Sequence, residues 1–445
     1  MFRPTGFADL AGRRVGIFGY GVEGRASAER LAGLAGSLVL VDDVEGRGPD
    51  VLVTAHGGLA ALATCDVVLK SPGIARRRPD VLELETRGVI VTSALNLWLH
   101  EVDRSRVVAI TGTKGKSTTT AIITFFLHCL GERAQSVGNI GQPPYRQPPG
   151  SASEWLVVEV SSFQCVDIDV APAVVVVTSL GADHLDWHGS LAQYVEDKLS
   201  LTRAAGAHDT LVPESPTFRN VQHQLGGVVS FVPGGEPELA AQLGLLGAHN
   251  ATNVALALRA VALLTGHALE HVRRVVGELA THFEPLPGRL TLVRRETRDG
   301  LEWRYVDDGL ATGPLPTVAA LAVFLDEPLA LIVGGYDRGV DYAPLAEAIA
   351  RRVAPTLVLT MGAAGRRIGD ALRARTSAFD PQSVDSMDDA LERAHAFLIS
   401  GGVVLLSPGA PSFDRYQNWR ERSEDFIRAV HAPGGPWSLG GDSNS

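Results

Sequence analysis

Along most of its 445 residues the chain alternates short runs of β-branched and aliphatic residues with segments of helical periodicity. Runs such as VGIFGYG (15–21), SLVLVDD (37–43) and VVLKSPG (67–73) are separated by segments such as RASAERLAGLA (25–35). Adjacent parallel strands need a crossover of about a dozen residues, usually a helix. The alternation therefore predicts an α/β fold built from parallel βαβ units.

The alternation falls into three sets, each long enough for one domain. The predicted domains are residues 1–102, residues 103–288, which open near RVVAITGTKGKST, and residues 289–431, which contain LALIVGGYDRG. The last residues, 432–445, are rich in Gly, Ser and Pro, a composition that predicts a disordered tail.

Charge and composition exclude several classes of protein. A net charge of −10 argues against nonspecific nucleic-acid binding, which needs a clustered basic face. Every long apolar run is broken by Gly or a charge, so we expect no membrane insertion. No signal-like apolar segment opens the chain, and three widely spaced cysteines indicate neither a disulfide framework nor a zinc site. We expect a cytoplasmic protein, with a monomer as the default.

Lysine is scarce in this sequence. Only four of the 40 Lys and Arg residues are lysines, namely Lys70, Lys114, Lys116 and Lys198. Because the two side chains differ in geometry and chemistry, each retained lysine is a candidate for a task that arginine cannot perform.

A glycine-rich segment, GTKGKST, lies between a β-branched run and a helical segment. Its residues are Gly112, Thr113, Lys114, Gly115, Lys116, Ser117 and Thr118. The placement is typical of a phosphate loop, in which backbone N–H groups surround phosphates, Lys116 reaches the β/γ oxygens and Ser117 or Thr118 binds Mg²⁺. The spacing departs from G-x-x-x-x-G-K-[ST] because position 110 is Ile. A helix start without a ligand is the alternative, and we predict ATP binding.

Further candidates lie near the ends of predicted strands. Glu159 closes the apolar run WLVVEV, Asp183 and His184 follow AVVVVTSL, and Lys198 lies one helix later. Because the carboxyl ends of parallel strands line one crevice, these side chains are expected to converge on the phosphate loop. Three alternatives stay open: a capping role for Glu159, a core histidine at 184 and a surface lysine at 198.

The first domain contains GYGVEG (19–24), a GxGxxG pattern that follows a strand-like run, with Asp42 and Asp43 about 20 residues later. Taken alone, the pattern predicts a dinucleotide-binding Rossmann domain. A lone fingerprint has low specificity, and nothing else in the sequence suggests hydride chemistry. Lys70 precedes Ser71-Pro72-Gly73 and is compatible with either a diphosphate contact or a salt bridge, so it is assigned no role.

Together these segments resemble the Mur ligases, and within them the D-type branch, which adds glutamate to UDP-N-acetylmuramoyl-L-alanine. The matching segments are Ser71-Pro72-Gly73-Ile74, the GTKGKST loop, Gly138-Asn139-Ile140-Gly141, Glu159-Val160-Ser161-Ser162-Phe163-Gln164, Asp183-His184, Lys198, His249-Asn250-x-x-Asn253, Leu286-Pro287-x-Arg289, Asp308, and Ser407-Pro408 with Ser412 and Asp414. The resemblance implies a three-domain α/β architecture with a Rossmann-like N-terminal domain, a P-loop central ATPase domain and a Rossmann-like C-terminal domain.

The resemblance also implies an ATP-dependent acid–amino-acid ligase of peptidoglycan synthesis. ATP phosphorylates the L-alanyl carboxylate, and a glutamate amine attacks the acyl phosphate. One Mg²⁺ is implied between the phosphates, Ser117 and Glu159. A second is implied at His184 and Lys198, with the lysine carbamylated by CO₂, because an ammonium cannot ligate Mg²⁺ but a carbamate oxygen can. Lys116, Glu159, His184 and Lys198 are thereby the implied catalytic residues.

The same resemblance implies binding roles in each domain. Asn253 would contact adenine, and Arg289 and Asp308 would hold phosphate and ribose as the domains close. The residues implied around UDP or its diphosphate are Val22, Glu23, Asp42, Asp43, Gly73 and Asn139. Those implied around glutamate are Thr312, Arg338, Ser412, Phe413 and Trp419.

The C-terminal domain departs from the D-glutamate-adding enzymes at several positions. Their D-S-K-A-T-N is Asp308-Gly309-Leu310-Ala311-Thr312-Gly313 here, so that a lysine becomes Leu310. Other changes put Arg338 in place of a lysine, Phe413 and Trp419 in place of leucine and phenylalanine, and Ser179 in place of an asparagine. Loss of a cation and enlarged apolar groups should alter how a dicarboxylate is held. We therefore favour the variant that adds L-glutamate and leaves inversion to a separate epimerase.

Other functions fit less well. Ordinary drift in a D-glutamate-adding enzyme is the main alternative. A folylpolyglutamate synthase shares the loop and the modified lysine, but it normally lacks a domain of about 100 residues before that loop. An NAD-dependent oxidoreductase would need a hydride site beside residues 19–24. A nonenzymatic nucleotide-binding module would not need Glu159, His184 and Lys198 together.

Overall fold

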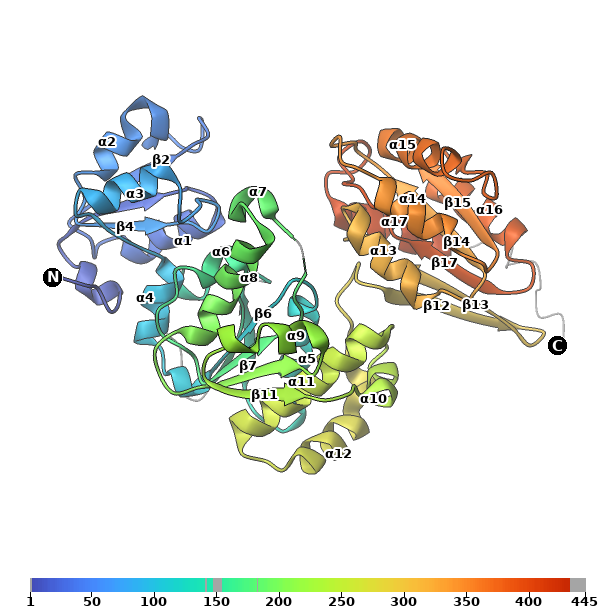
Figure 1. The fold of residues 1–445 in the computed structure, drawn as a ribbon, viewed down its shortest axis with the longest axis horizontal. Helices are drawn as coiled ribbons and strands as arrows, with labels where there is room; N and C mark the ends of the chain where they lie inside the picture. The colour runs from blue at the N-terminus through green and yellow to red at the C-terminus, as the bar shows by residue number, and fades with distance from the viewer. Residues whose placement is uncertain (1, 141, 147–153, 182, 433–445) are drawn as a thin grey trace, which may run out of the picture. The chain divides into compact units, whose positions relative to one another are not determined.

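The structure is a computed structural model, and it describes residues 2–140, 142–146, 154–181 and 183–432. The chain divides into two compact units, Met1–Leu239 with His249–Ala280, and Ala240–Ala248 with Thr281–Ser445 (Figure 1). Gly141 and all but the first residue of the expected disordered tail lie outside the described residues. The domain boundaries near 103 and 288 stay a prediction.

The first sheet of the larger unit is parallel, with strand order β3-β2-β1-β4-β5. Its strands are β1 (Arg14–Phe18), β2 (Ser37–Asp42), β3 (Val51–Val53), β4 (Val67–Lys70) and β5 (Ile90–Thr92). The helices of this part are α1 (Val22–Leu31), α2 (Leu59–Leu62), α3 (Pro79–Thr86) and α4 (Ala94–Glu101). Strands and helices alternate as the sequence predicts, except that β2 and β3 follow one another without a helix between them.

The second sheet is also parallel, with strand order β11-β10-β9-β6-β8-β7. Its strands are β6 (Val107–Thr111), β7 (Ala134–Gly138), β8 (Trp155–Glu159), β9 (Val174–Val177), β10 (Asp209–Pro213) and β11 (Val228–Val232). The helices are α5 (Lys116–Cys129), α6 (Ser162–Cys165), α7 (Leu185–His188), α8 (Leu191–Leu199), α9 (Pro216–Asn220), α10 (Pro237–Gln242), α11 (Ala248–Thr265) and α12 (Leu269–Leu279). Strands β6, β8 and β9 are neighbours, so their carboxyl ends lie side by side.

One apolar core joins these two sheets. It includes Val15 and Val67 of the first sheet, Leu97 and Trp98 of α4, and Val107 of the second sheet. Burying this continuous surface opposes separation of the two sheets, which explains why both belong to one compact unit.

The smaller unit contains a mixed sheet with strand order β12-β13-β17-β14-β15-β16, in which only the β12–β13 pair is antiparallel among the described pairs. Its strands are β12 (Thr291–Arg298), β13 (Leu301–Asp307), β14 (Leu329–Gly334), β15 (Thr356–Met361), β16 (Gln382–Ser383) and β17 (Gly402–Leu406). The helices are α13 (Pro314–Val323), α14 (Ala343–Ala350), α15 (Gly362–Arg373), α16 (Met387–Phe397) and α17 (Trp419–His431).

Helices cover both faces of this sheet (Figure 1). Along β14, Leu331 and Val333 join the cluster that contains α13, α14 and α15 residues, whereas Ala330 and Ile332 join the one that contains α16 and α17 residues. Successive side chains of a strand point to opposite faces, so an unbroken apolar run is the pattern that a doubly covered strand requires.

No single helix in the described part of the chain is both long and apolar enough to cross a membrane; α11 and the helical segment after it pass that test only as a pair bent by 119°.

Candidate nucleotide and ligase site

The phosphate-loop segment connects β6 to the first turn of α5. Gly112 has φ +141°, and a Cβ there would lie 2.1 Å from Thr178 Oγ1; Gly115 has φ +88°, and its Cβ would lie 2.7 Å from Asn253 Oδ1. Both positions therefore require glycine. Lys116 Nζ donates to the carbonyls of Gly112 (3.0 Å) and Thr113 (3.2 Å). The loop thus curves around its own lysine at a helix N-terminus, the geometry that suits phosphate.

The end of β9 holds the other side of this loop. Thr178 Oγ1 donates to the Lys114 carbonyl (2.5 Å), and Ser179 Oγ accepts from the Lys114 N–H (2.8 Å). Lys114 Nζ forms an exposed ion pair with Asp183 at 3.3 Å. Ser117 is buried and Thr118 half-buried in the first turn of α5. Ser179, where relatives were expected to have asparagine, therefore helps to fix the loop.

Glu159 ends β8 and is 2% exposed. Its Oε1 accepts from Asn139 Nδ2 at 2.7 Å, while Oε2 is buried and has no hydrogen-bond partner among the described residues. A buried carboxylate oxygen without a donor is costly. Oxygen ligands are those that Mg²⁺ prefers, so this orphaned oxygen fits a cation ligand.

Lys198, near the end of α8, is 1% exposed, so the surface-lysine alternative is wrong. Its Nζ donates to the Gly112 carbonyl at 2.9 Å and lies 4.9 Å from the Tyr194 ring. None of the described carboxylates forms an ion pair with it. Burial lowers the pKa of Lys198 to about 7, which gives the neutral amine at a pH where an exposed lysine is charged.

His184 is exposed, so the core-histidine alternative is also wrong. It has φ +48° and its ring lies 5.0 Å from that of Phe163. No cluster of three or more His, Cys, Asp and Glu residues that could hold a metal occurs in the described ranges. The metal ligands expected from the sequence would not form such a cluster, because they combine a hydroxyl, a carboxylate, an imidazole and a modified lysine.

The first domain contains all of the residues expected around UDP except Asn139, which follows β7 of the second sheet. Asp42 accepts from the backbone N–H groups of Tyr20 (2.6 Å) and Val44 (2.8 Å) and so shapes the glycine turn. Asp43 pairs with Arg78 and accepts from Thr54 Oγ1, and these interactions lower its pKa. Asp43, Thr54 and Arg78 line a hollow of about 480 Å³. Val22 is exposed at the start of α1, and Gly73 follows β4.

Glu23 lies where the first domain meets the second sheet. Tyr145 Oη donates to its Oε2 (2.7 Å) and Gln164 Nε2 donates to its Oε1 (2.8 Å). Burial raises the pKa of Glu23, although the two hydrogen bonds act in the opposite direction. Both carboxylate oxygens are thus engaged within the protein, and the nucleotide role expected for Glu23 stays a prediction.

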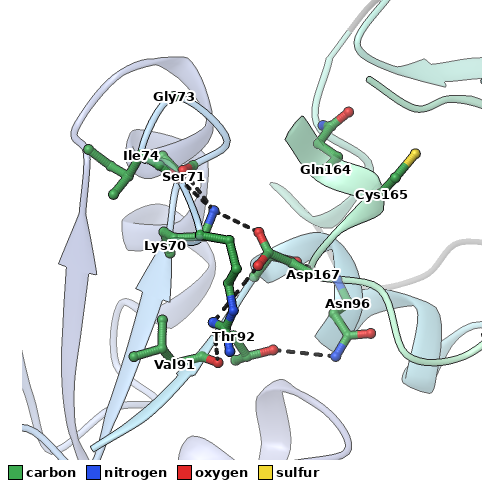
Figure 2. Close-up of polar contacts among 12 residues, drawn as sticks. Lys70, Ser71, Gly73, Ile74, Val91, Thr92, Asn96, Gln164, Cys165 and Asp167 are labelled. Atoms are coloured by element: carbon green, nitrogen blue, oxygen red, sulfur yellow. Dashed lines mark hydrogen bonds and ion pairs between the residues drawn. The ribbon is translucent and has the colours of Figure 1, made fainter. Parts of the chain in front are cut away.

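Lys70 belongs to a buried ion pair, one of the two arrangements left open for it. Its Nζ lies 2.7 Å from Asp167 Oδ2, and the side chains are 0% and 1% exposed (Figure 2). Lys70 also donates to the Ile74 carbonyl at 2.9 Å, and Arg76 lies 3.9 Å from the other Asp167 oxygen. The pair connects the end of β4 to the segment after α6.

In the smaller unit, Asp308 follows β13 and accepts from Ser407 Oγ at 2.7 Å. Burial raises its pKa to about 7. Arg289 is half-buried and exerts an electrostatic effect on Asp308. The Trp419 ring packs against Gly288, where an added Cβ would lie 2.5 Å from the ring. These residues belong to a different unit from the phosphate loop and Asn253.

Four of the five expected glutamate residues lie on loops after three strands, and the fifth, Trp419, is the first residue of α17. Thr312 is exposed after β13, Arg338 follows β14, and buried Ser412 and exposed Phe413 follow β17. The Arg338 guanidinium lies 5.9 Å from the centre of the Phe413 ring. Tyr336, which the sequence did not single out, lies 6.5 Å from the same ring. An exposed aromatic pair beside a cation can hold the stem and one carboxylate of an acidic amino acid.

Arg422 of α17 is a second residue that sequence reasoning missed. It is 3% exposed and donates to the carbonyls of Gly309 (3.0 Å), Gly334 (3.3 Å) and Ala410 (3.0 Å). Burial lowers the pKa of Arg422 to about 10. Gly309 lies in the loop after β13, Gly334 ends β14 and Ala410 lies in the loop after β17, so one side chain joins all three segments. Arginine at helical spacing gives no sequence signal for such a role.

Comparison with known proteins gives a consistent result. A family model described as the Mur ligase middle domain matches residues 110–215. The chain is 37% identical to the UDP-N-acetylmuramoyl-L-alanine–L-glutamate ligase of a Micromonospora species, over 96% of this chain and 98% of that protein. It is 36% identical to the protein of the same name from Xanthomonas euvesicatoria, over 95% and 96%.

Solved structures share the fold. The UDP-N-acetylmuramate-alanine ligase MurC of Thermotoga maritima aligns with a TM-score of 0.53 at 17% identity, over 94% of this chain and 99% of that one. The MurF ligase of the same organism, in complex with ADP, aligns with a TM-score of 0.54 at 14% identity, over 96% and 97%. These alignments confirm the predicted α/β architecture, and the full-length sequence identity shows that the chain belongs to the Mur ligase family.

Proposed function

We propose that this chain is an ATP-dependent ligase that adds glutamate, and specifically L-glutamate, to UDP-N-acetylmuramoyl-L-alanine in peptidoglycan precursor synthesis. The observation that carries the proposal is the 37% identity, over nearly the whole of both chains, to a protein of that name. The phosphate loop and the buried Lys198 beside it support the same reaction class.

In this reaction the substrate carboxylate takes the γ-phosphoryl group of ATP, and the amine of glutamate then displaces phosphate from the acyl phosphate. Catalysis of this kind depends on positioning and on neutralising phosphate charge. Lys116, at the start of α5, would exchange its contacts with the Gly112 and Thr113 carbonyls for phosphate oxygens. Lys114 and the loop N–H groups would hold the remaining oxygens.

Two Mg²⁺ ions would neutralise phosphate charge and polarise the reacting oxygens. Ser117 and Glu159 are the proposed ligands of one, and the orphaned Glu159 Oε2 supports this assignment. His184 and Lys198 are the proposed ligands of the other, with Lys198 as a carbamate. The buried Nζ, which faces a backbone carbonyl and pairs with none of the described carboxylates, supports this modification.

The binding roles follow the domains. Val22, Glu23, Asp42, Asp43, Gly73 and Asn139 are proposed for the UDP end of the substrate. Asn253, Arg289 and Asp308 are proposed for ATP, in addition to the phosphate loop. Thr312, Arg338, Ser412, Phe413 and Trp419 are proposed for glutamate.

The preference for L-glutamate rests on two supports. Both relatives compared above carry L-glutamate in their names. Leu310 also replaces the lysine that D-glutamate-adding enzymes use, and an apolar side chain cannot pair with a carboxylate. The D-glutamate-adding ligase of the same pathway is the alternative, and an enzyme specific for L-glutamate would require a downstream epimerase.

The deciding experiment measures ADP release with ATP, Mg²⁺ and UDP-N-acetylmuramoyl-L-alanine, adding L- or D-glutamate separately. Release that depends on L-glutamate is expected, with little release for D-glutamate. A strong preference for D-glutamate would overturn the choice of enantiomer, whereas no release with either would overturn the ligase assignment.

We further infer that the protein is a cytoplasmic monomer. Cell fractionation would test the location, and sedimentation would test the oligomeric state.

A further inference from the structure

Asp197 is a buried carboxylate to which the proposed reaction assigns no role. It precedes Lys198 in α8 and is 2% exposed. Arg77 donates to both of its oxygens, at 3.0 and 2.8 Å, and Gln193 Nε2 donates at 2.9 Å. His188 Nδ1 lies 2.7 Å from Asp197 Oδ2. Four contacts of this kind compensate the cost of burying a charge and fix its position.

These contacts extend to the three chain segments that carry the proposed metal ligands outside the phosphate loop, namely Glu159, His184 and Lys198. The second nitrogen of His188, Nε2, lies 3.0 Å from Ser162 Oγ. Ser162 begins α6, just beyond Glu159, and His188 ends α7, which follows His184. With Nδ1–H directed to the carboxylate, Nε2 accepts a hydrogen bond from the Ser162 hydroxyl. Asp197 is therefore the node of a buried network that joins α6, α7 and α8.

Arg77 connects this node to the first domain. It follows Ser71–Gly73, the turn proposed to lie at the UDP diphosphate, and its side chain is 53% exposed while its partner is buried. The same turn makes a second contact, because Trp187 Nε1 donates to the Gly73 carbonyl at 3.3 Å. The nucleotide turn is thus bonded to α7 through Gly73, and the segment that follows the turn is bonded to α8 through Arg77.

We propose that Asp197 is a positioning residue that holds the segments of Glu159, His184 and Lys198 in register, and that Arg77 makes this register depend on the nucleotide turn. The identity of the three ligands rests on the proposed function; the network itself does not. Partners that orient metal ligands typically change metal affinity by about 10- to 100-fold when removed. A network that only joined domains would change stability and leave metal affinity alone.

The test compares Mn²⁺ binding in the presence of ADP, read from the electron paramagnetic resonance of free Mn²⁺, for the full-length wild type and variants. Asp197→Asn and Arg77→Ala should each weaken binding about tenfold or more, and Arg77→Lys should restore part of the loss. The matched control is Arg87→Ala, which removes an exposed i,i+4 ion pair with Glu83 in the same domain and should leave Mn²⁺ affinity unchanged.

Mn²⁺ affinity within about twofold of wild type in both Asp197→Asn and Arg77→Ala would overturn the proposal, whatever their melting temperatures. If Asp197→Asn does not fold, the comparison of Arg77→Ala with Arg77→Lys decides. Wild-type protein that binds Mn²⁺ with ADP but releases no ADP with glutamate would instead overturn the proposed function, so the two failures are distinguishable.

Discussion

Burial gives Lys198 a chemistry that an exposed lysine lacks. With its Nζ bonded to the Gly112 carbonyl and its pKa lowered to about 7 by desolvation, the amine is partly neutral near physiological pH. Only the neutral amine attacks CO₂, and only the resulting carbamate presents anionic oxygens to a cation. An arginine at this position would remain charged and could not be converted.

Lys198→Ala should therefore lower kcat by about 100-fold or more while leaving the fold intact. Formate or acetate should restore part of the activity, because a small carboxylate can occupy the space of the carbamate. Lys198→Arg should stay inactive with or without the acid. The measurement is ADP release across a carboxylate titration, with wild type as the control that the acids should not stimulate. Full activity of either variant would contradict the ligand assignment.

His395 leads to a prediction about stability and pH. It is half-buried with Nε2 3.0 Å from Tyr305 Oη, and burial lowers its pKa to about 3. The unfolded chain therefore binds the proton first, so stability is complete above about pH 6.5 and is lost as pH falls toward 3. Allowing for partial exposure, the loss at about pH 5 is about 1 kcal/mol.

His395→Phe should flatten this pH dependence of the unfolding free energy between about pH 7.5 and pH 5. It should lower stability at neutral pH because the hydrogen bond between the Tyr305 hydroxyl and the imidazole is lost. Urea unfolding at several pH values measures both effects. The exposed His271→Phe is the control and should keep the wild-type slope; an equal slope in His395→Phe would refute the explanation.

How far the sequence predicts single residues depends on whether the partners are local. The glycines at 112 and 115 could be predicted to need special backbone geometry because the loop motif is contiguous. The partners of Lys70 and Glu23 could not, since Asp167 and Gln164 come from another domain. Composition identified Lys70 as unusual, but only the three-dimensional fold distinguishes a buried ion pair from a diphosphate contact.

At the scale of elements, strand runs and helix alternation were predictable because a doubly covered strand must be apolar throughout. The contacts by which Arg422 connects the segments at the strand ends could not be predicted, because Arg422 lies 88 residues from one of its acceptors, the Gly334 carbonyl. Three carbonyls, one at the end of β14 and two in the loops after β13 and β17, share this one guanidinium. The loops that carry Thr312, Arg338 and Ser412 therefore depend on α17 for their spacing.

Arg422→Met should leave these carbonyls without donors and lower the unfolding free energy by about 2–4 kcal/mol. By loosening the loops it should also raise KM for glutamate about tenfold. Arg422→Lys should recover only part, because one ammonium cannot reach all three acceptors. The control is Arg428→Met in the same helix, which removes exposed ion pairs with Asp388 and Asp425 and should cost about 1 kcal/mol or less. Lower stability with an unchanged KM for glutamate would contradict the positioning role.

For the molecule as a whole, the first two sheets act as one body because they share an apolar core through α4. The Lys70–Asp167 pair adds a charged contact across the same boundary. Buried pairs of this type contribute little net stability, since desolvation offsets the attraction, but removing one partner leaves an uncompensated charge. The main effect of the pair is therefore to disfavour arrangements of the two domains that would separate the two charges. Its contribution to the strength of their association is small.

This view predicts the outcome of a double-mutant cycle on Lys70 and Asp167. Lys70→Met and Asp167→Leu should each lower the unfolding free energy of the larger unit by about 3–5 kcal/mol, because the first leaves Asp167 with only the longer 3.9 Å contact to Arg76 and the second leaves a buried ammonium without its carboxylate. The double variant should recover most of that loss, because neither charge remains. Chemical denaturation of the four proteins measures the coupling. Arg219→Ala, which breaks an exposed ion pair with Glu214, is the control and should leave the unfolding free energy close to the wild-type value. KM for UDP-N-acetylmuramoyl-L-alanine should stay near the wild-type value in the double variant if Lys70 contacts only protein; a large rise in KM without loss of stability would assign Lys70 to the diphosphate instead.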